Sequence, residues 1–65
     1  MSSALTKRER QVMLLRSEGL YSSEIATSLK CKKRTVDMHL YNVYKKTGIR
    51  NLAELLKYVN DNMKD

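Results

Sequence analysis

Apolar residues recur at helical spacing along four stretches of the chain, and no stretch alternates as a half-buried strand would. The chain has no proline, and its two glycines, Gly19 and Gly48, fall between the apolar stretches. The pattern therefore predicts an all-α fold with helices at about 6–18, 22–29, 33–47 and 51–63. A length of 65 residues fits one domain, 1–65, and is too short for two.

Helix starts are marked by residues that can accept hydrogen bonds from free backbone amides. Thr6 and Glu9 have the spacing of a capping box, in which each side chain accepts from the other residue's backbone N–H. Asn51 and Glu54 repeat that spacing before the last stretch. Ser22 is the expected N-cap of the second helix.

The third helix is predicted to have a buried stripe and an exposed basic face. At 100° per residue, the stripe consists of Val36, Leu40, Val43 and Thr47. The opposite side carries Arg34, Met38, Tyr41 and Lys45. An aromatic ring and a thioether thus stand among cations on the face that we expect solvent or a partner to meet.

The second and third helices have the spacing of a helix-turn-helix, which sets two helices at a steep angle. The expected buried hinge positions are Ile25, Ala26, Leu29, Cys31 and Val36. The fourth helix has a wide apolar band of Leu52, Leu55, Leu56, Val59 and Met63. Such a band exceeds what a terminal helix of a small domain needs, so part of it is expected to face a partner.

The positive charge is concentrated in one segment. The net charge is +6, and residues 30–50 hold seven of the thirteen Lys and Arg residues against one acid, Asp37. This segment alone therefore accounts for the whole excess. A polyanion partner is the simplest reason to concentrate like charge, and an ordinary solvated face is the alternative.

Several functions are disfavoured by composition. One Cys and one His cannot form an internal disulfide or a four-ligand zinc site, so we expect no metal and no cofactor. No nucleophile has a base and an acid at a plausible spacing, which argues against an enzyme. No apolar run is long enough for a membrane span and no signal peptide is evident, so a cytoplasmic protein with a reduced thiol is expected.

The motifs across residues 5–56 resemble the LuxR-type (GerE/FixJ/NarL-like) DNA-binding domain of bacterial transcription regulators. The matching motifs are Leu-Thr-x-Arg-Glu at 5–9, Glu-Ile-Ala at 24–26, Thr-Val-x-x-His at 35–39, and Asn42, Lys46, Gly48 and Asn51. The resemblance implies a tri-helical core without a wing, plus a C-terminal helix. It also implies sequence-specific binding of double-stranded DNA, with helix 33–47 in the major groove.

The resemblance further implies roles for individual residues. Base contacts are expected from Arg34, Asp37, Met38, Tyr41 and Asn42. Phosphate contacts are expected from Lys32, Lys33, Thr35, Lys45 and Lys46. A homodimer is expected through helix 51–63, with Leu52, Leu56, Val59 and Met63 at its interface.

Three departures from the family pattern leave alternatives open. Lys32 stands where Ser usually caps the third helix, so that cap should be lost. Thr47 replaces a usual Leu and thins the core. Asp37 either accepts from cytosine N4 and restricts the site, or only balances Arg34. The alternative function is an interaction module that has the same fold, works through another regulator or RNA polymerase, and binds DNA weakly or nonspecifically.

Overall fold

The computed structural model of the protein describes residues 5–63, which form four α-helices. Their bounds are α1 (Lys7–Ser17), α2 (Ser22–Leu29), α3 (Lys33–Thr47) and α4 (Leu52–Asn62). The all-α prediction is confirmed, and no strand occurs among these residues. The expected domain, 1–65, extends at both ends beyond the described residues.

Helices α2 and α3 have the predicted bounds, whereas α1 and α4 are each one residue shorter at both ends. The difference arises because Thr6, Glu18, Asn51 and Met63 are cap residues that lie just outside the two helices. At the start of α1 the predicted capping box forms in full. The Thr6 hydroxyl accepts from the Glu9 N–H, and the Glu9 carboxylate accepts from the Thr6 N–H, each at 3.0 Å.

The start of α2 differs from the prediction, because Tyr21 is the N-cap and Ser22 is already helical. A phenol lies too far from its own backbone to accept from the first-turn amides. Glu24 supplies the one contact, accepting from the Tyr21 N–H at 2.8 Å. The predicted cap on Ser22 was wrong by one residue.

Both ends of α3 agree with the prediction, whereas the start of α4 agrees only in part. Lys32, the N-cap of α3, makes no side-chain cap hydrogen bond, as expected. Gly48 ends α3 with a φ of 77°, in the left-handed region that glycine tolerates best. Asn51 accepts from the Glu54 N–H at 2.9 Å, but the Glu54 carboxylate accepts from the Arg50 N–H instead of that of Asn51. Only half of the second capping box forms.

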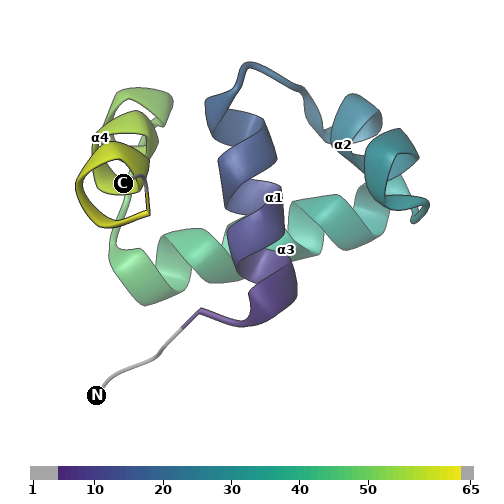
Figure 1. Cartoon of the computed structure of the whole chain (residues 1–65). Helices are drawn as coiled ribbons and strands as arrows, with labels where there is room; N and C mark the ends of the chain where they lie inside the picture. The colour runs from purple at the N-terminus through teal and green to yellow at the C-terminus, as the bar shows by residue number, and fades with distance from the viewer. Residues whose placement is uncertain (1–4, 64–65) are drawn as a thin grey trace.

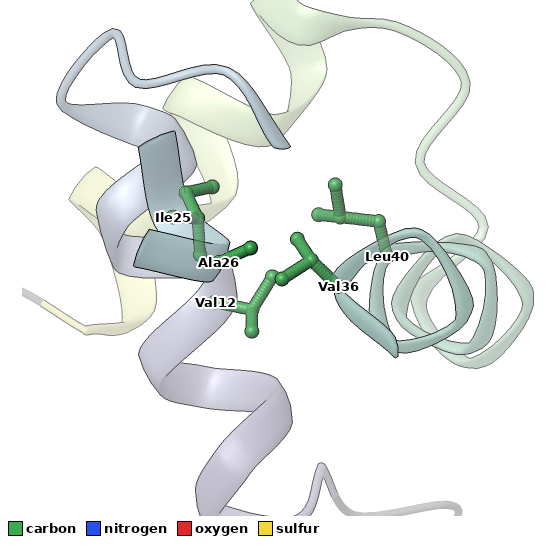
Figure 2. Close-up of a cluster of buried hydrophobic side chains, with 5 residues drawn as sticks. All are labelled: Val12, Ile25, Ala26, Val36 and Leu40. Carbon is green, nitrogen blue, oxygen red and sulfur yellow. The ribbon is translucent and has the colours of Figure 1, made fainter. Parts of the chain in front are cut away.

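The first core cluster joins α1, α2 and α3 and contains Val12, Ile25, Ala26, Val36 and Leu40. Figure 2 shows these side chains converging from the three helices. Leu29 and Cys31 are partly buried against the cluster. All five predicted hinge residues therefore lie in or against one cluster, which fixes the angle between α2 and α3.

The second core cluster joins α1, α3 and α4 and contains Met13, Val43, Ile49, Leu55 and Val59. Tyr44 packs against both clusters and so links them. Helix α1 packs against all three other helices, and Figure 1 shows α3 crossing behind α1, with α2 and α4 on opposite sides. The two clusters together hold α3 along its length and leave its other face outward.

Candidate nucleic-acid interface

The outward face of α3 carries most of the residues expected to contact bases. Arg34, Asp37, Met38 and Tyr41 are all exposed, and Asn42 is half-buried at the edge of the face. Met38 and Tyr41 are 59% and 61% exposed, which is high for large apolar side chains. Val36, Leu40 and Val43 on the opposite face are buried in the two core clusters. The core therefore holds α3 so that these residues can reach a partner.

Thr47, the last position of the predicted buried stripe, is half-buried, and its hydroxyl forms hydrogen bonds with nearby backbone groups. Its hydroxyl donates to the Val43 carbonyl at 2.8 Å and accepts from the Ile49 N–H at 3.3 Å. The departure from Leu therefore leaves no buried hydroxyl without a partner.

Asp37 forms an ion pair with Lys33, one turn earlier on α3, at 2.9 Å. The Ser22 hydroxyl, followed by the Lys33 ammonium, lowers the pKa of the Asp37 carboxyl. The alternative in which Asp37 balances Arg34 named the wrong cation, because Lys33 is the residue within reach. Both members of the pair are largely exposed, so a nucleic acid could still separate them.

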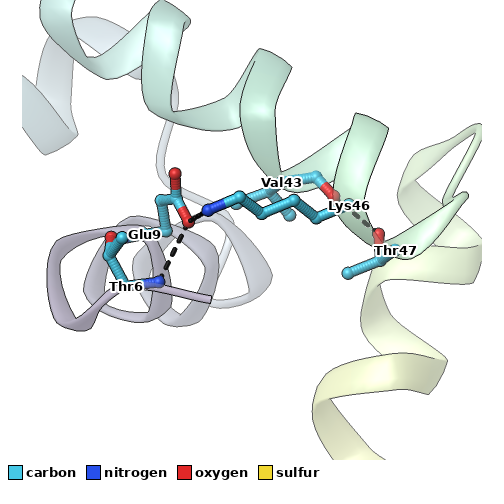
Figure 3. Close-up of polar contacts among 5 residues, drawn as sticks. All are labelled: Thr6, Glu9, Val43, Lys46 and Thr47. Atoms are coloured by element: carbon cyan, nitrogen blue, oxygen red, sulfur yellow. Dashed lines mark hydrogen bonds and ion pairs between the residues drawn. The ribbon is translucent and has the colours of Figure 1, made fainter. Parts of the chain in front are cut away.

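Lys46 points inward at the end of α3, toward the first turn of α1. Its ammonium lies 2.7 Å from the Glu9 carboxylate, and the two side chains are 28% and 5% exposed. Figure 3 shows the same carboxylate oxygen accepting from the Thr6 backbone. Lys46, expected at a DNA phosphate, is thus already engaged with a buried acid.

Glu9 is the one buried charged residue among those described, and the sequence suggested only a capping role for it. Burial raises the pKa of Glu9, but the hydrogen bonds from Lys46 and Thr6 together outweigh this effect, and the net shift is downward. The carboxylate is therefore held in its charged form. The only sequence signal was the cap spacing, which says nothing about a residue 37 positions away.

Lys45 points the other way from Lys46. Its ammonium nitrogen lies 5.6 Å from the centre of the Tyr41 ring, which is within the range of a cation–π contact. Adjacent lysines of α3 thus have different surroundings, an exposed aromatic ring for Lys45 and a buried carboxylate for Lys46.

Fewer cations of the 30–50 segment are available to a polyanion than the number of Lys and Arg residues in the sequence implies. Within residues 5–63, two cations of the 30–50 segment are in ion pairs, Lys33 with Asp37 and Lys46 with Glu9. The remaining cations, all exposed and without an ion pair among the described residues, are Lys30, Lys32, Arg34, Lys45 and Arg50. Thr35, the expected neutral phosphate contact, is also exposed. These residues frame the outward face of α3 and its two ends.

The four residues expected at a dimer interface separate into two pairs. Leu52 and Leu56 are 41% and 42% exposed on α4. Val59 is 1% exposed inside the second core cluster, and Met63 packs against that cluster. The prediction that Val59 lies at a dimer interface is wrong, because its side chain is buried in the core of this domain. Met63 is only partly accessible.

His39 and Cys31 are half-buried, and no group of three or more His, Cys, Asp or Glu residues gathers within the described part of the chain. None of the helices described there is long and apolar enough to cross a membrane.

The outward face of α3 presents cations together with an aromatic ring and a thioether. Such a surface can contact phosphate oxygens and base edges.

Comparison with known proteins agrees with this arrangement. Residues 3–59 match the family model described as bacterial regulatory proteins, luxR family. The chain is 36% identical over 63 residues to the CsgBAC operon transcriptional regulatory protein of Escherichia coli, a match that covers 97% of this chain and 29% of the relative. It is 40% identical over 57 residues to the transcriptional regulatory protein UhpA of E. coli, covering 88% of this chain and 29% of UhpA. A probable transcriptional regulator, ycf29 of Cyanophora paradoxa, is 40% identical over 57 residues, 88% of this chain and 27% of the relative. The chain thus spans less than a third of the length of these relatives.

Proposed function

The chain belongs to the luxR family of bacterial regulatory proteins, and from this membership we propose that it binds double-stranded DNA in a sequence-specific manner to regulate transcription. The observation that carries the proposal is the outward face of α3. Arg34, Met38 and Tyr41 are exposed there, while the opposite side of the same helix is locked into both core clusters. In a helix-turn-helix protein, the second helix of the motif enters the major groove.

Base edges and phosphates are contacted by different residues in this proposal. Arg34, Asp37, Met38 and Asn42 face the bases, Tyr41 lies exposed among them, and the Met38 thioether is suited to a thymine methyl group. Asp37 restricts the accepted sequences, since a carboxylate accepts from cytosine N4 but is repelled by phosphate. Lys32, Thr35 and Lys45 supply the main phosphate contacts.

Lys33 and Lys46 contribute less net attraction to DNA than their charge suggests. Each is already paired with an acid, so approaching a phosphate either adds a third partner or breaks the pair. Breaking the Lys46 pair would leave the Glu9 carboxylate, which is only 5% exposed, without its cation. Lys46 is therefore proposed to orient α3 on α1 first and to contact DNA second.

Two copies are proposed to bind adjacent half-sites through α4. Leu52 and Leu56 form the contact, since both are large, apolar and exposed. A single module of this size covers only about 600–1,000 Å² of protein surface on DNA, so a second copy would add substantially to affinity. Leu56→Glu should abolish paired occupancy of a two-half-site duplex while the melting temperature of the domain stays unchanged.

Selection of duplexes from a random pool by the purified protein tests the function. We expect one enriched motif, with two related half-sites if the dimer forms on DNA. With the enriched duplex in hand, Asp37→Ala should change the preferred sequence, whereas Lys45→Met should weaken binding to all sequences alike. Equal recovery of all sequences would instead favour the alternative function, an interaction module with weak, nonspecific DNA binding.

A further inference from the structure

Tyr41 and Lys45 lie one helical turn apart on the exposed face of α3. The Lys45 ammonium is 5.6 Å from the ring centre, and Tyr41 is 61% exposed. Side chains four residues apart on a helix are neighbours, so the backbone of α3 sets this contact. The Tyr41 ring therefore lies next to a long cation that has no ion-pair partner among the described residues.

Lys45 contacts an aromatic ring, whereas the other two lysines of α3 contact carboxylates. Lys33 and Lys46 each pair with a carboxylate, so each of these pairs has a net charge of zero. An aromatic ring attracts an ammonium through its quadrupole and leaves the net charge of the pair at +1. Among the described residues, Lys45 is thus the lysine of α3 that contacts another side chain in a pair with a net positive charge.

We propose that Tyr41 is a positioning residue that holds the Lys45 ammonium in place for one backbone phosphate of duplex DNA. This inference rests on the proposed DNA-binding function. Lysine is among the side chains that lose most rotamer freedom when ordered, and a contact that orders it beforehand lowers the cost of binding. In this role the Tyr41 ring makes the contact with the ammonium, and the Tyr41 hydroxyl is not needed.

This role differs from base reading and leads to opposite expectations for conservative substitutions. A residue that reads a base through its hydroxyl loses its preference when that hydroxyl is removed. A residue that positions a cation through its ring tolerates Phe and fails with Leu, which has similar apolarity but no quadrupole. The position of Tyr41 beside Lys45 favours the second behaviour.

The test measures the affinity of six proteins, the unmodified protein and five variants, for two duplexes of equal length, the selected sequence and a scrambled one. The variants are Tyr41→Phe, Tyr41→Leu, Lys45→Met and the double variant Tyr41→Leu with Lys45→Met. Lys57→Met is the charge control, because Lys57 is 78% exposed on α4, where it pairs with Asp61. Thermal unfolding of each variant verifies the fold, which these exposed substitutions should leave intact.

Tyr41→Phe should bind both duplexes as the unmodified protein does, with the same preferred sequence. Tyr41→Leu should lose about twofold to fivefold on both duplexes, the size expected of one exposed cation–π contact. In the Lys45→Met background the Tyr41→Leu loss should vanish, because the ring then has no cation to hold. Lys45→Met should also flatten the dependence of affinity on salt by about one phosphate contact, which Lys57→Met should not do.

A changed sequence preference in Tyr41→Phe, or additive losses in the double variant, would overturn the positioning role. Because a phosphate contact is independent of sequence, the coupling can be measured on either duplex. Equal affinity for the two duplexes would therefore refute sequence-specific function while leaving the Tyr41–Lys45 coupling to be judged on its own. Absence of binding to both duplexes would overturn both proposals.

Discussion

Replacing Lys46 by Met should destabilise the domain far more than replacing a surface lysine. Lys46→Met removes the cation from the Glu9 carboxylate, which is 5% exposed. The Thr6 backbone N–H, 3.0 Å away, is then the remaining hydrogen-bond donor to that carboxylate among the described residues. Methionine keeps most of the aliphatic stem, so the substitution isolates the ammonium. Losing a charged hydrogen-bond partner of a buried group costs about 2–3 kcal/mol.

For a domain of this size, each kcal/mol lowers the melting temperature by about 4–8 °C, so the predicted fall exceeds about 8 °C. Thermal unfolding followed by circular dichroism at 222 nm measures it. Lys57→Met is the matched control, because its ion pair with Asp61 is 3.1 Å long but 78% and 50% exposed. That control should change stability by no more than about 0.5 kcal/mol.

The same pair predicts a pH dependence with a definite sign. The pKa of Glu9 is lowered from its ordinary value of 4.5 by Lys46 and Thr6 against the opposing effect of burial. The folded state therefore holds the Glu9 proton less tightly than the unfolded state, and the stabilisation is fully present above pH 4.5. It is lost as the pH falls through the lowered pKa, so the stability gap between the unmodified protein and Lys46→Met should close on acidification. Equal melting temperatures for Lys46→Met and Lys57→Met at pH 7 would refute the claim that the Lys46–Glu9 pair stabilises the packing of α3 on α1.

Three further stability predictions follow from the backbone and the core. Lys30 has a φ of 57°, so Lys30→Gly should stabilise the domain by about 0.5–1 kcal/mol, and Lys30→Ala should bring no gain; equal melts for the two variants would contradict this. Val59→Ala should cost about 2 kcal/mol in chemical unfolding because Val59 is 1% exposed, whereas Leu56→Ala should cost less than about 0.5 kcal/mol in the monomer; the reverse order would place Leu56 in the core. Thr6→Ala should cost about 1 kcal/mol through loss of the α1 cap, and an unchanged urea midpoint would show that the cap contributes nothing.

Local patterns along the chain were enough to predict the helices and the hinge. The spacing of Val36, Leu40 and Val43 correctly indicated which side of α3 is buried, because α1 and α2 pack on that side. The capping box at Thr6 was predictable because both partners lie within one turn. The misplaced cap at Ser22 shows the limit of such patterns, since a favourable side chain does not decide which residue takes the extended cap conformation.

Contacts between distant helices were not predictable in the same way. Nothing local indicates that the first turn of α1 meets the last turn of α3, so Glu9 and Lys46 were assigned separate roles. On α4, periodicity identifies an apolar band but not which edge of it faces α1. Leu55 and Val59 pack inward and Leu52 and Leu56 remain outward, a division that depends on how α4 is placed against α1.

The central claim, that the outward face of α3 binds DNA, is tested most directly by an NMR titration. Backbone amide shifts of the 15N-labelled protein would be followed as the selected duplex is added. The account predicts that the largest changes fall at exposed positions between Lys32 and Lys45, with Arg34, Met38 and Tyr41 among them, and that buried residues of α1 change little. Changes centred on α4 or on α1, with α3 unaffected, would contradict it.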